Sequence, residues 1–83
     1  MNKYYVYILK STHFLNKTYV GFTENLENRL KEHNQGEVGY TKQFKPWGIQ
    51  TYIAFEDKDS ATHFEKYLKS GSGQACLKKR LLP

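Results

Sequence analysis

The first hydrophobic segment of the chain is an unbroken run of aromatic, aliphatic and β-branched residues at positions 4–10, YYVYILK. Residues of these types favour the pleated backbone of a β-strand. Alternation along a strand places Tyr5, Tyr7 and Leu9 on one face and aliphatic side chains on the other. Because both faces are largely apolar, we expect this strand to be central in its sheet.

A second strand is predicted at residues 17–22, KTYVGF, after a polar segment with Asn16 at a turn position. A hairpin of this kind pairs the two strands in antiparallel orientation. Gly21 lies inside the second strand, where a glycine indicates either a bend or a close backbone approach.

The pattern then changes to helical spacing, with Leu26 and Leu30 one turn apart on an apolar stripe. Thr23 is the expected N-cap of this helix, and Asn34 comes at its end, before a glycine stop signal. The following residues 36–46 are polar and glycine-bearing, so we expect a loop there.

The second half of the chain predicts a third strand at residues 48–56, turn and cap residues at 57–60, and a helix that runs through Ser70. Residues 71–73, Gly-Ser-Gly, are expected to form a flexible break, and residues 74–82 a short helix or a basic tail. The order β-β-α-β-α, with one further short helix, predicts an α/β protein of the α+β type. Its core element would be a small three-stranded antiparallel sheet flanked by helices.

The length of 83 residues predicts one domain that spans 1–83 and buries a modest core. Cys76 is the single cysteine, so we expect no disulfide framework and a reducing, cytoplasmic environment. The apolar run near the N-terminus is short and lacks a small-residue cleavage site. We therefore expect neither a signal peptide nor a membrane span.

The formal net charge of +5 favours an anionic partner, with nucleic acid as the first candidate. Tyr40 and Trp47 are available for stacking on an unpaired base, although we favour Trp47 as a core anchor at the start of the third strand. The candidate nucleic-acid contacts are the basic residues Lys10, Lys42, Lys45, Lys66, Lys69, Lys78, Lys79 and Arg80.

Arg29 and His33 are four residues apart, so they lie on the same face of the first predicted helix, beside its leucine stripe. An arginine at the rim of a sheet can pair two phosphate oxygens with its planar fork. A histidine beside it can donate a hydrogen bond or move a proton. The alternative is a solvated helix face on which charges alternate.

Tyr7 and Tyr19 can lie close together if the first two strands form a hairpin. A phenol has an ordinary pKa of about 10 and accepts a proton only if its surroundings lower that value. The alternative is ordinary cross-strand packing of two tyrosines.

Glu65 in the second predicted helix offers one carboxylate at the edge of the apolar face. Mg²⁺ often takes only one or two protein oxygens and completes its coordination with water and phosphate. The alternative is a surface ion pair between Glu65 and Lys69, four residues later.

The order of these residues resembles that of the GIY-YIG nuclease domain. The two signature triplets are present as YVY, ending at Tyr7, and YVG, beginning at Tyr19. The resemblance extends from about Lys3 to Arg80 and is carried by the phrases YVGFTENLENRLKEHNQG and KPWGIQTYIAFEDKDSATHFEKYLK. The chain is similar to the small stand-alone GIY-YIG proteins of bacteria. It is also similar to the catalytic domain of eukaryotic structure-specific repair nucleases.

The resemblance implies phosphodiester hydrolysis at a single divalent metal, Mg²⁺ or Mn²⁺. By analogy, Glu65 would ligate the metal, and Tyr19 or Tyr7 would help to activate the attacking water. Arg29 would hold the scissile phosphate, and His33 would support the tyrosine or the phosphate. The implied substrate is DNA rather than RNA, in branched, nicked or damaged forms as in DNA repair, with a partner protein as one source of specificity.

Two positions depart from the family pattern. Tyr5 stands where the name-giving glycine would be, and no asparagine follows Asn34, although many family nucleases have one after the glutamate helix. Gln74 lies in roughly that region. The alternative function is therefore a nucleic-acid-binding module with weak or no catalysis, and a third is a protein-interaction subunit for an acidic partner.

Overall fold

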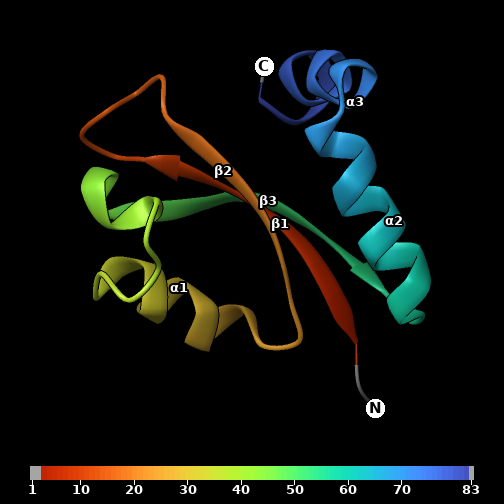
Figure 1. Cartoon of the computed structure of the whole chain (residues 1–83), viewed down its shortest axis with the longest axis horizontal. Helices are drawn as coiled ribbons and strands as arrows, with labels where there is room; N and C mark the ends of the chain where they lie inside the picture. Colours follow the sequence, from red (N-terminus) through yellow and green to blue (C-terminus); the bar gives the residue numbers. More distant parts are fainter. Residues whose placement is uncertain (1–2, 83) are drawn as a thin grey trace.

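The computed structural model describes residues 3–82 (Figure 1). Its strands are β1 (Tyr4–Ser11), β2 (Thr18–Thr23) and β3 (Trp47–Phe55), which form one antiparallel sheet in the order β2-β1-β3. The apolar first strand is central, as predicted. The α+β fold with a three-stranded antiparallel sheet and flanking helices is therefore confirmed.

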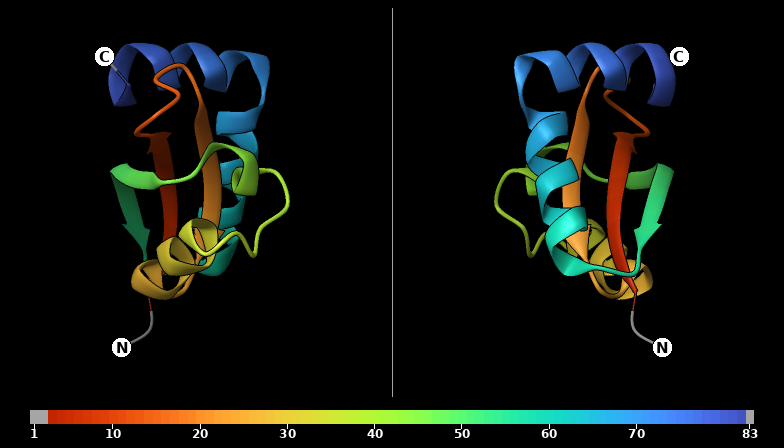
Figure 2. Two further views of the ribbon diagram at one scale, coloured as in Figure 1. Left: turned by 90° about the vertical axis from the view of Figure 1, so that its left-hand side faces the viewer. Right: turned by 90° about the vertical axis from the view of Figure 1, so that its right-hand side faces the viewer.

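Helices cover both faces of the sheet (Figure 2). On one face lies α1 (Leu26–Asn34), followed by the 3₁₀ turn η1 (Thr41–Phe44). On the other face lie α2 (Lys58–Lys69), α3 (Gly71–Cys76) and the π-helical turn η2 (Leu77–Leu81). Within residues 3–82, no helix is long and apolar enough to cross a membrane.

The alternation of β1 divides the buried side chains into two clusters, one on each face of the sheet. On the α2 side the cluster comprises Val6, Ile8, Val20, Ala61, Leu68 and Leu77. On the α1 side it comprises Tyr7, Leu9 and Trp47, with Leu26, Leu30 and Phe44 packed against it. Each helix is thus fixed by its own apolar stripe, and the α1 side carries the polar residues considered below.

Asn25, rather than Thr23, is the N-cap of α1. Its side chain accepts a hydrogen bond from the backbone N–H of Asn28 at 3.1 Å. The Thr23 residue is instead the last residue of β2, opposite Tyr5 on β1, so its backbone belongs to the sheet. The Thr23 hydroxyl accepts from the backbone N–H of Asn25 at 3.1 Å and so supports the cap.

The expected flexible break at residues 71–73 is wrong, because the chain is helical there. The hydroxyl of Ser70 accepts from the backbone N–H of Gly73 at 3.2 Å and caps α3. A Cβ atom at Gly73 would lie 1.7 Å from the carbonyl oxygen of Tyr67. This glycine therefore allows two helical segments to approach closely, and the expected short terminal helix begins earlier than residue 74.

The side chain of Asn34 joins the two ends of the segment between α1 and β3. The Oδ1 atom of Asn34 accepts from the backbone N–H of Trp47 at 2.6 Å, and its Nδ2 donates to the Trp47 carbonyl at 3.1 Å. The amide thus pairs with the backbone of β3 much as a residue of a neighbouring strand would. Trp47 is 3% exposed, which agrees with its expected place in the core.

The pairing of β1 with β3 is interrupted once. Leu9 pairs with Ile49, but Ile8 pairs with Thr51, so Gln50 is an extra residue on β3. Such a β-bulge locally increases twist and disrupts the ladder.

Candidate functional site

Tyr7 lies opposite Gly21 in the register of β1 and β2, and its ring crosses the glycine. A Cβ atom at Gly21 would lie 2.3 Å from the Tyr7 hydroxyl oxygen. The sequence predicted a bend or a close backbone approach at Gly21, but the group that approaches it is the side chain of Tyr7. Because β2 is an edge strand, the phenol reaches out from the central strand to the side of the sheet.

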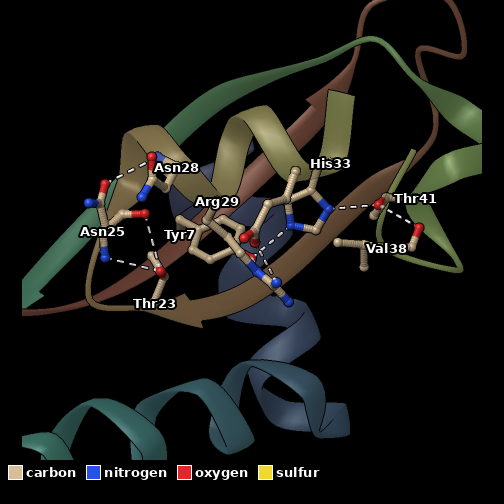
Figure 3. A network of polar contacts seen from close by, with 9 residues as sticks. Tyr7, Thr23, Asn25, Asn28, Arg29, His33, Val38 and Thr41 are labelled. Carbon is tan, nitrogen blue, oxygen red and sulfur yellow. Dashed lines mark hydrogen bonds and ion pairs between the residues drawn. The ribbon is translucent and has the colours of Figure 1, made fainter. Parts of the chain in front are cut away.

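A chain of polar contacts starts at this phenol and runs through α1 to the following loop (Figure 3). The Tyr7 oxygen lies 2.8 Å from Nε2 of His33 and accepts from Nε of Arg29 at 3.3 Å. The Nδ1 atom of His33 lies 2.6 Å from the hydroxyl of Thr41. That hydroxyl is 3.3 Å from the carbonyl oxygen of Val38.

One assignment of donors and acceptors gives every proton in this series of hydrogen bonds an acceptor. The Thr41 hydroxyl donates to the Val38 carbonyl and accepts from Nδ1–H of His33. Nε2 of His33 is then a lone pair, so it accepts from the phenol of Tyr7. The phenol oxygen in turn accepts from Arg29. In this tautomer the lone pair on Nε2 of His33 faces the phenolic proton of Tyr7.

Burial keeps both members of the Tyr7–His33 pair neutral near pH 7. The pKa of His33 is lowered to about 4, first by burial and then by the nearby Arg29 charge. Burial raises the pKa of Tyr7 to about 12, and this outweighs the opposing hydrogen bond from Arg29. Tyr7 is thus a protonated donor in the free protein.

Arg29 is oriented by Glu32, one helical turn away. Nη1 of Arg29 donates to Oε1 of Glu32 at 2.9 Å, and this bond, with the one to Tyr7, raises the guanidinium pKa. The Arg29 side chain is 35% exposed. A fixed and accessible guanidinium beside Tyr7 is suited to hold an anion such as phosphate.

Tyr19 lies beside the same pair, as the hairpin predicts. The centroid of its ring is 5.0 Å from that of His33 and 6.3 Å from that of Tyr7. The Tyr19 ring also stacks on Tyr40, with 6.3 Å between the ring centroids, and the Lys69 ammonium lies 5.8 Å from its centroid. The Tyr19 ring therefore lies between the buried Tyr7–His33 pair and the exposed ring of Tyr40.

Glu65 comes from α2, which runs beside β2 in both views of Figure 2. Its side chain is 21% exposed and pairs with the Lys69 ammonium at 3.2 Å. Because Lys69 also lies over Tyr19, the carboxylate is placed near the β2 edge of the site. The negative charge of Glu65 also contributes to the raised pKa of Tyr7. The surface ion pair between Glu65 and Lys69 is present, and the role of Glu65 as a metal ligand stays a prediction.

The residues present fit a divalent cation held through one protein ligand. Within residues 3–82, no group of three or more His, Cys, Asp or Glu side chains could form a closed metal cage. A half-buried carboxylate that already attracts an ammonium, beside an arginine suited to phosphate, is compatible with an open site completed by water and phosphate.

All eight basic residues expected to contact nucleic acid are exposed, but they are spread over the molecule. Lys69 belongs to the site, and Lys42 follows Thr41 in η1. Lys10 instead lines a separate cavity of about 380 Å³. The remaining ones are Lys45 before β3, Lys66 on α2, and Lys78, Lys79 and Arg80 on η2.

The sequence did not identify Thr41, Glu32 or Asn34 as contributors to this site. The contact of Glu32 with Arg29 could have been predicted, because the two residues are three positions apart on the same helix. The role of Thr41 could not, since a single threonine in a polar loop is not expected to be buried. Gln74, which we expected in roughly the region of the family asparagine, donates to the Leu68 carbonyl at 2.8 Å near the end of α2.

Residues 3–80 match the GIY-YIG catalytic domain. The chain belongs to the GIY-YIG family. The UPF0213 protein of Staphylococcus haemolyticus is 38% identical over 79 residues, which are 94% of this chain and 94% of that relative. The UPF0213 protein of Clostridium perfringens is 41% identical over 66 residues, which are 78% of this chain and 69% of that relative.

A solved structure agrees with this membership. The solution NMR structure of the UPF0213 protein from Bacillus halodurans has a TM-score of 0.57 and 27% identity to this chain. The match covers 98% of this chain and 88% of that one.

Proposed function

We propose that this GIY-YIG protein is an endonuclease that hydrolyses phosphodiester bonds in DNA with a divalent metal, Mg²⁺ or Mn²⁺. The observation that carries the proposal is the buried contact of 2.8 Å between the Tyr7 phenol and Nε2 of His33, with Arg29 on the same phenol oxygen. Ordinary packing of a tyrosine and a histidine does not require this arrangement of donors and acceptors.

The pair can move a proton away from an attacking water. As the water oxygen bonds to phosphorus, its proton passes to the Tyr7 oxygen, and the phenolic proton passes to Nε2 of His33. The P–O bond on the opposite side breaks, and the leaving oxygen takes a proton from solvent. Tyr7 alone is a poor base because burial raises its pKa, so the neutral imidazole is needed as the final acceptor.

Substrate binding would strengthen this base. In the free protein, burial and the positive charge of Arg29 lower the pKa of His33 to about 4. A phosphate on Arg29 would bring negative charge beside the imidazole and offset the guanidinium charge, and both effects raise the pKa of a histidine. His33 would therefore become a better proton acceptor when DNA occupies the site.

Glu65 is the residue that would hold the metal, with Lys69 displaced from the carboxylate. The bound metal would polarise the phosphate and stabilise the leaving oxygen. Arg29 would hold the phosphate and counter the charge that grows in the transition state.

Aromatic rings beside the site support an unpaired or distorted DNA region as the substrate. Tyr40 is 50% exposed, stacks on Tyr19, and lies 5.4 Å from Phe44 between ring centroids. Phe14 extends this row of aromatic rings, with its ring centroid 5.4 Å from that of Phe44. The Lys17 ammonium lies 5.1 Å from the centroid of the Phe44 ring. Exposed aromatic rings with nearby cations bind unstacked bases and the backbone that joins them.

The test is cleavage of labelled single-stranded, duplex, nicked, flapped and four-way-branched DNA, and of RNA, with Mg²⁺ or Mn²⁺ and with or without EDTA. Wild type would be compared with Arg29→Ala and Glu65→Ala. Lys31→Ala and Glu56→Gln are matched controls, because both positions are exposed charges and neither belongs to the polar chain at Tyr7. Metal-dependent cleavage lost in the first two variants and kept in the controls is the expected result.

A second candidate is a nucleic-acid-binding module without efficient catalysis. The observation that favours it is that Gln74, expected in roughly the region of the absent family asparagine, donates its side-chain amide to the Leu68 carbonyl. In that case wild type, Arg29→Ala and Glu65→Ala would all fail to cut, while wild type would still bind DNA with a steep dependence on salt.

A further inference from the structure

Thr41, the first residue of the short turn η1, is unusual because it is fully buried, with 0% exposure. A buried hydroxyl needs hydrogen-bond partners, and Thr41 has two of different kinds. One is the Nδ1 atom of His33 at 2.6 Å, and the other is the carbonyl oxygen of Val38 at 3.3 Å (Figure 3).

The position of Thr41 is fixed from the other side by Trp47. The indole Nε1 of Trp47 donates to the Thr41 carbonyl oxygen at 2.8 Å in a buried contact. The backbone of Trp47 is in turn bonded twice by the side chain of Asn34, which ends the helix that carries His33. The hydroxyl therefore faces the imidazole in one defined arrangement.

We propose that Thr41 is a positioning residue that selects the tautomer of His33. The Val38 carbonyl can only accept, so it takes the proton of the Thr41 hydroxyl, and the hydroxyl oxygen then receives Nδ1–H of His33. This leaves Nε2 as the lone pair that faces Tyr7. The importance of this tautomer for hydrolysis rests on the proposed function, whereas the assignment itself does not.

The other tautomer would block the proton transfer. With the proton on Nε2, the imidazole would donate to the Tyr7 oxygen, which already accepts from Arg29. His33 could not then take a proton from Tyr7. A hydroxyl that both accepts and donates is therefore required at position 41.

The experiment uses ¹⁵N-labelled protein and long-range ¹H–¹⁵N spectra of the imidazole nitrogens, together with DNA cleavage kinetics. Thr41→Val keeps the shape of the side chain without its hydroxyl, and Thr41→Ser keeps the hydroxyl. Thr62→Val is the matched control, since the Thr62 hydroxyl donates only to backbone carbonyls of α2. The chain has three histidines, and the exposed His13 and His63 serve as internal references.

The expected wild-type spectrum has the His33 proton on Nδ1. Thr41→Val should shift this proton toward Nε2. The kcat of this variant should fall about 10- to 100-fold with little change in KM, the loss typical when the hydrogen-bond partner that orients a metal-bound histidine is removed. Thr41→Ser should restore both the tautomer and most of kcat. Thr62→Val should match wild type.

Several outcomes would overturn the proposal. A wild-type proton on Nε2 would do so alone, even if Thr41→Val did not fold. An Nδ1 proton that persists in Thr41→Val, or equal losses of kcat in the Val and Ser variants, would assign Thr41 a merely structural role. If wild type cut no nucleic acid, the proposed function would fail, but the spectra would still decide the tautomer.

Discussion

The phenol ring of Tyr7 occupies the space that a side chain at Gly21 would need. The two residues are direct cross-strand neighbours, and the clash would involve the hydroxyl that contacts His33. Gly21, the last residue of the YVG triplet, therefore contributes to the site because its missing side chain leaves room for the ring of Tyr7.

Gly21→Ala should displace Tyr7 and separate its phenol from His33. Overfilling a packed site costs about 1–3 kcal/mol, so a lower denaturation midpoint and weaker DNA cleavage are both expected. Gly48→Ala is the matched control in another strand, because a Cβ atom there would meet nothing within 4 Å. Equal stability and cleavage in the two variants would contradict this account of Gly21.

Tyr7→Phe should retain the fold and lose most of the cleavage rate. The change removes the oxygen that links Arg29 to His33, and loss of general acid–base catalysis lowers rates by about 10²- to 10⁴-fold. Tyr5→Phe, two residues earlier in the same strand, is the control. The measurement is kcat on the DNA that wild type cuts best, and an unchanged value for Tyr7→Phe would refute the proton relay.

Stability should increase with pH between about 4 and 6.5 because of His33. Its pKa is lowered to about 4 in the folded protein, against an ordinary value of 6.5, so the unfolded chain binds more protons in this window. Stability is therefore lost as the pH falls, by up to ~3 kcal/mol. Urea denaturation of wild type and His33→Gln at several pH values tests this.

The slope of stability against pH should be smaller in His33→Gln, whereas His63→Gln, at an exposed position, should keep it. The same slope in all three proteins would mean that His33 is not the group responsible.

Glu65→Gln should weaken Mn²⁺ binding while leaving stability almost unchanged. The ion pair with Lys69 is a helix-surface pair, and such pairs contribute only about 0.3–0.5 kcal/mol. Electron paramagnetic resonance titration of Mn²⁺ measures the affinity, with Glu56→Gln as the control for loss of one carboxylate. Undiminished Mn²⁺ binding by Glu65→Gln would rule out this carboxylate as the ligand.

The sheet could be predicted from the sequence because it depends on patterns among residues that are close together in the chain. Tyr7 and Leu9 alternate with aliphatic residues, and the strand they form has the two-sided burial expected of a central position. The neighbourhood of Arg29 and His33 followed from helical spacing alone. These features depend on residues close together in the chain.

The features that the sequence missed depend on contacts between distant segments. Gly73 looked flexible, yet it packs against the backbone of Tyr67. Thr23 and Asn25 are both acceptable caps, and pairing of Thr23 with β1 decided between them. The burial of Thr41 depends on Trp47 and His33, which no periodic pattern joins to it.

The side-chain amide at Trp47 and the bulge at Gln50 both lie on β3, an edge strand whose residues Trp47–Phe55 include no charge. An uncharged edge strand of this length can recruit strands from other molecules and seed aggregation. Here the amide covers the first backbone groups, and the bulge breaks the regular spacing of those that follow. We therefore expect the amide and the bulge, together with Lys45 and Pro46 just before the strand, to oppose edge-to-edge association.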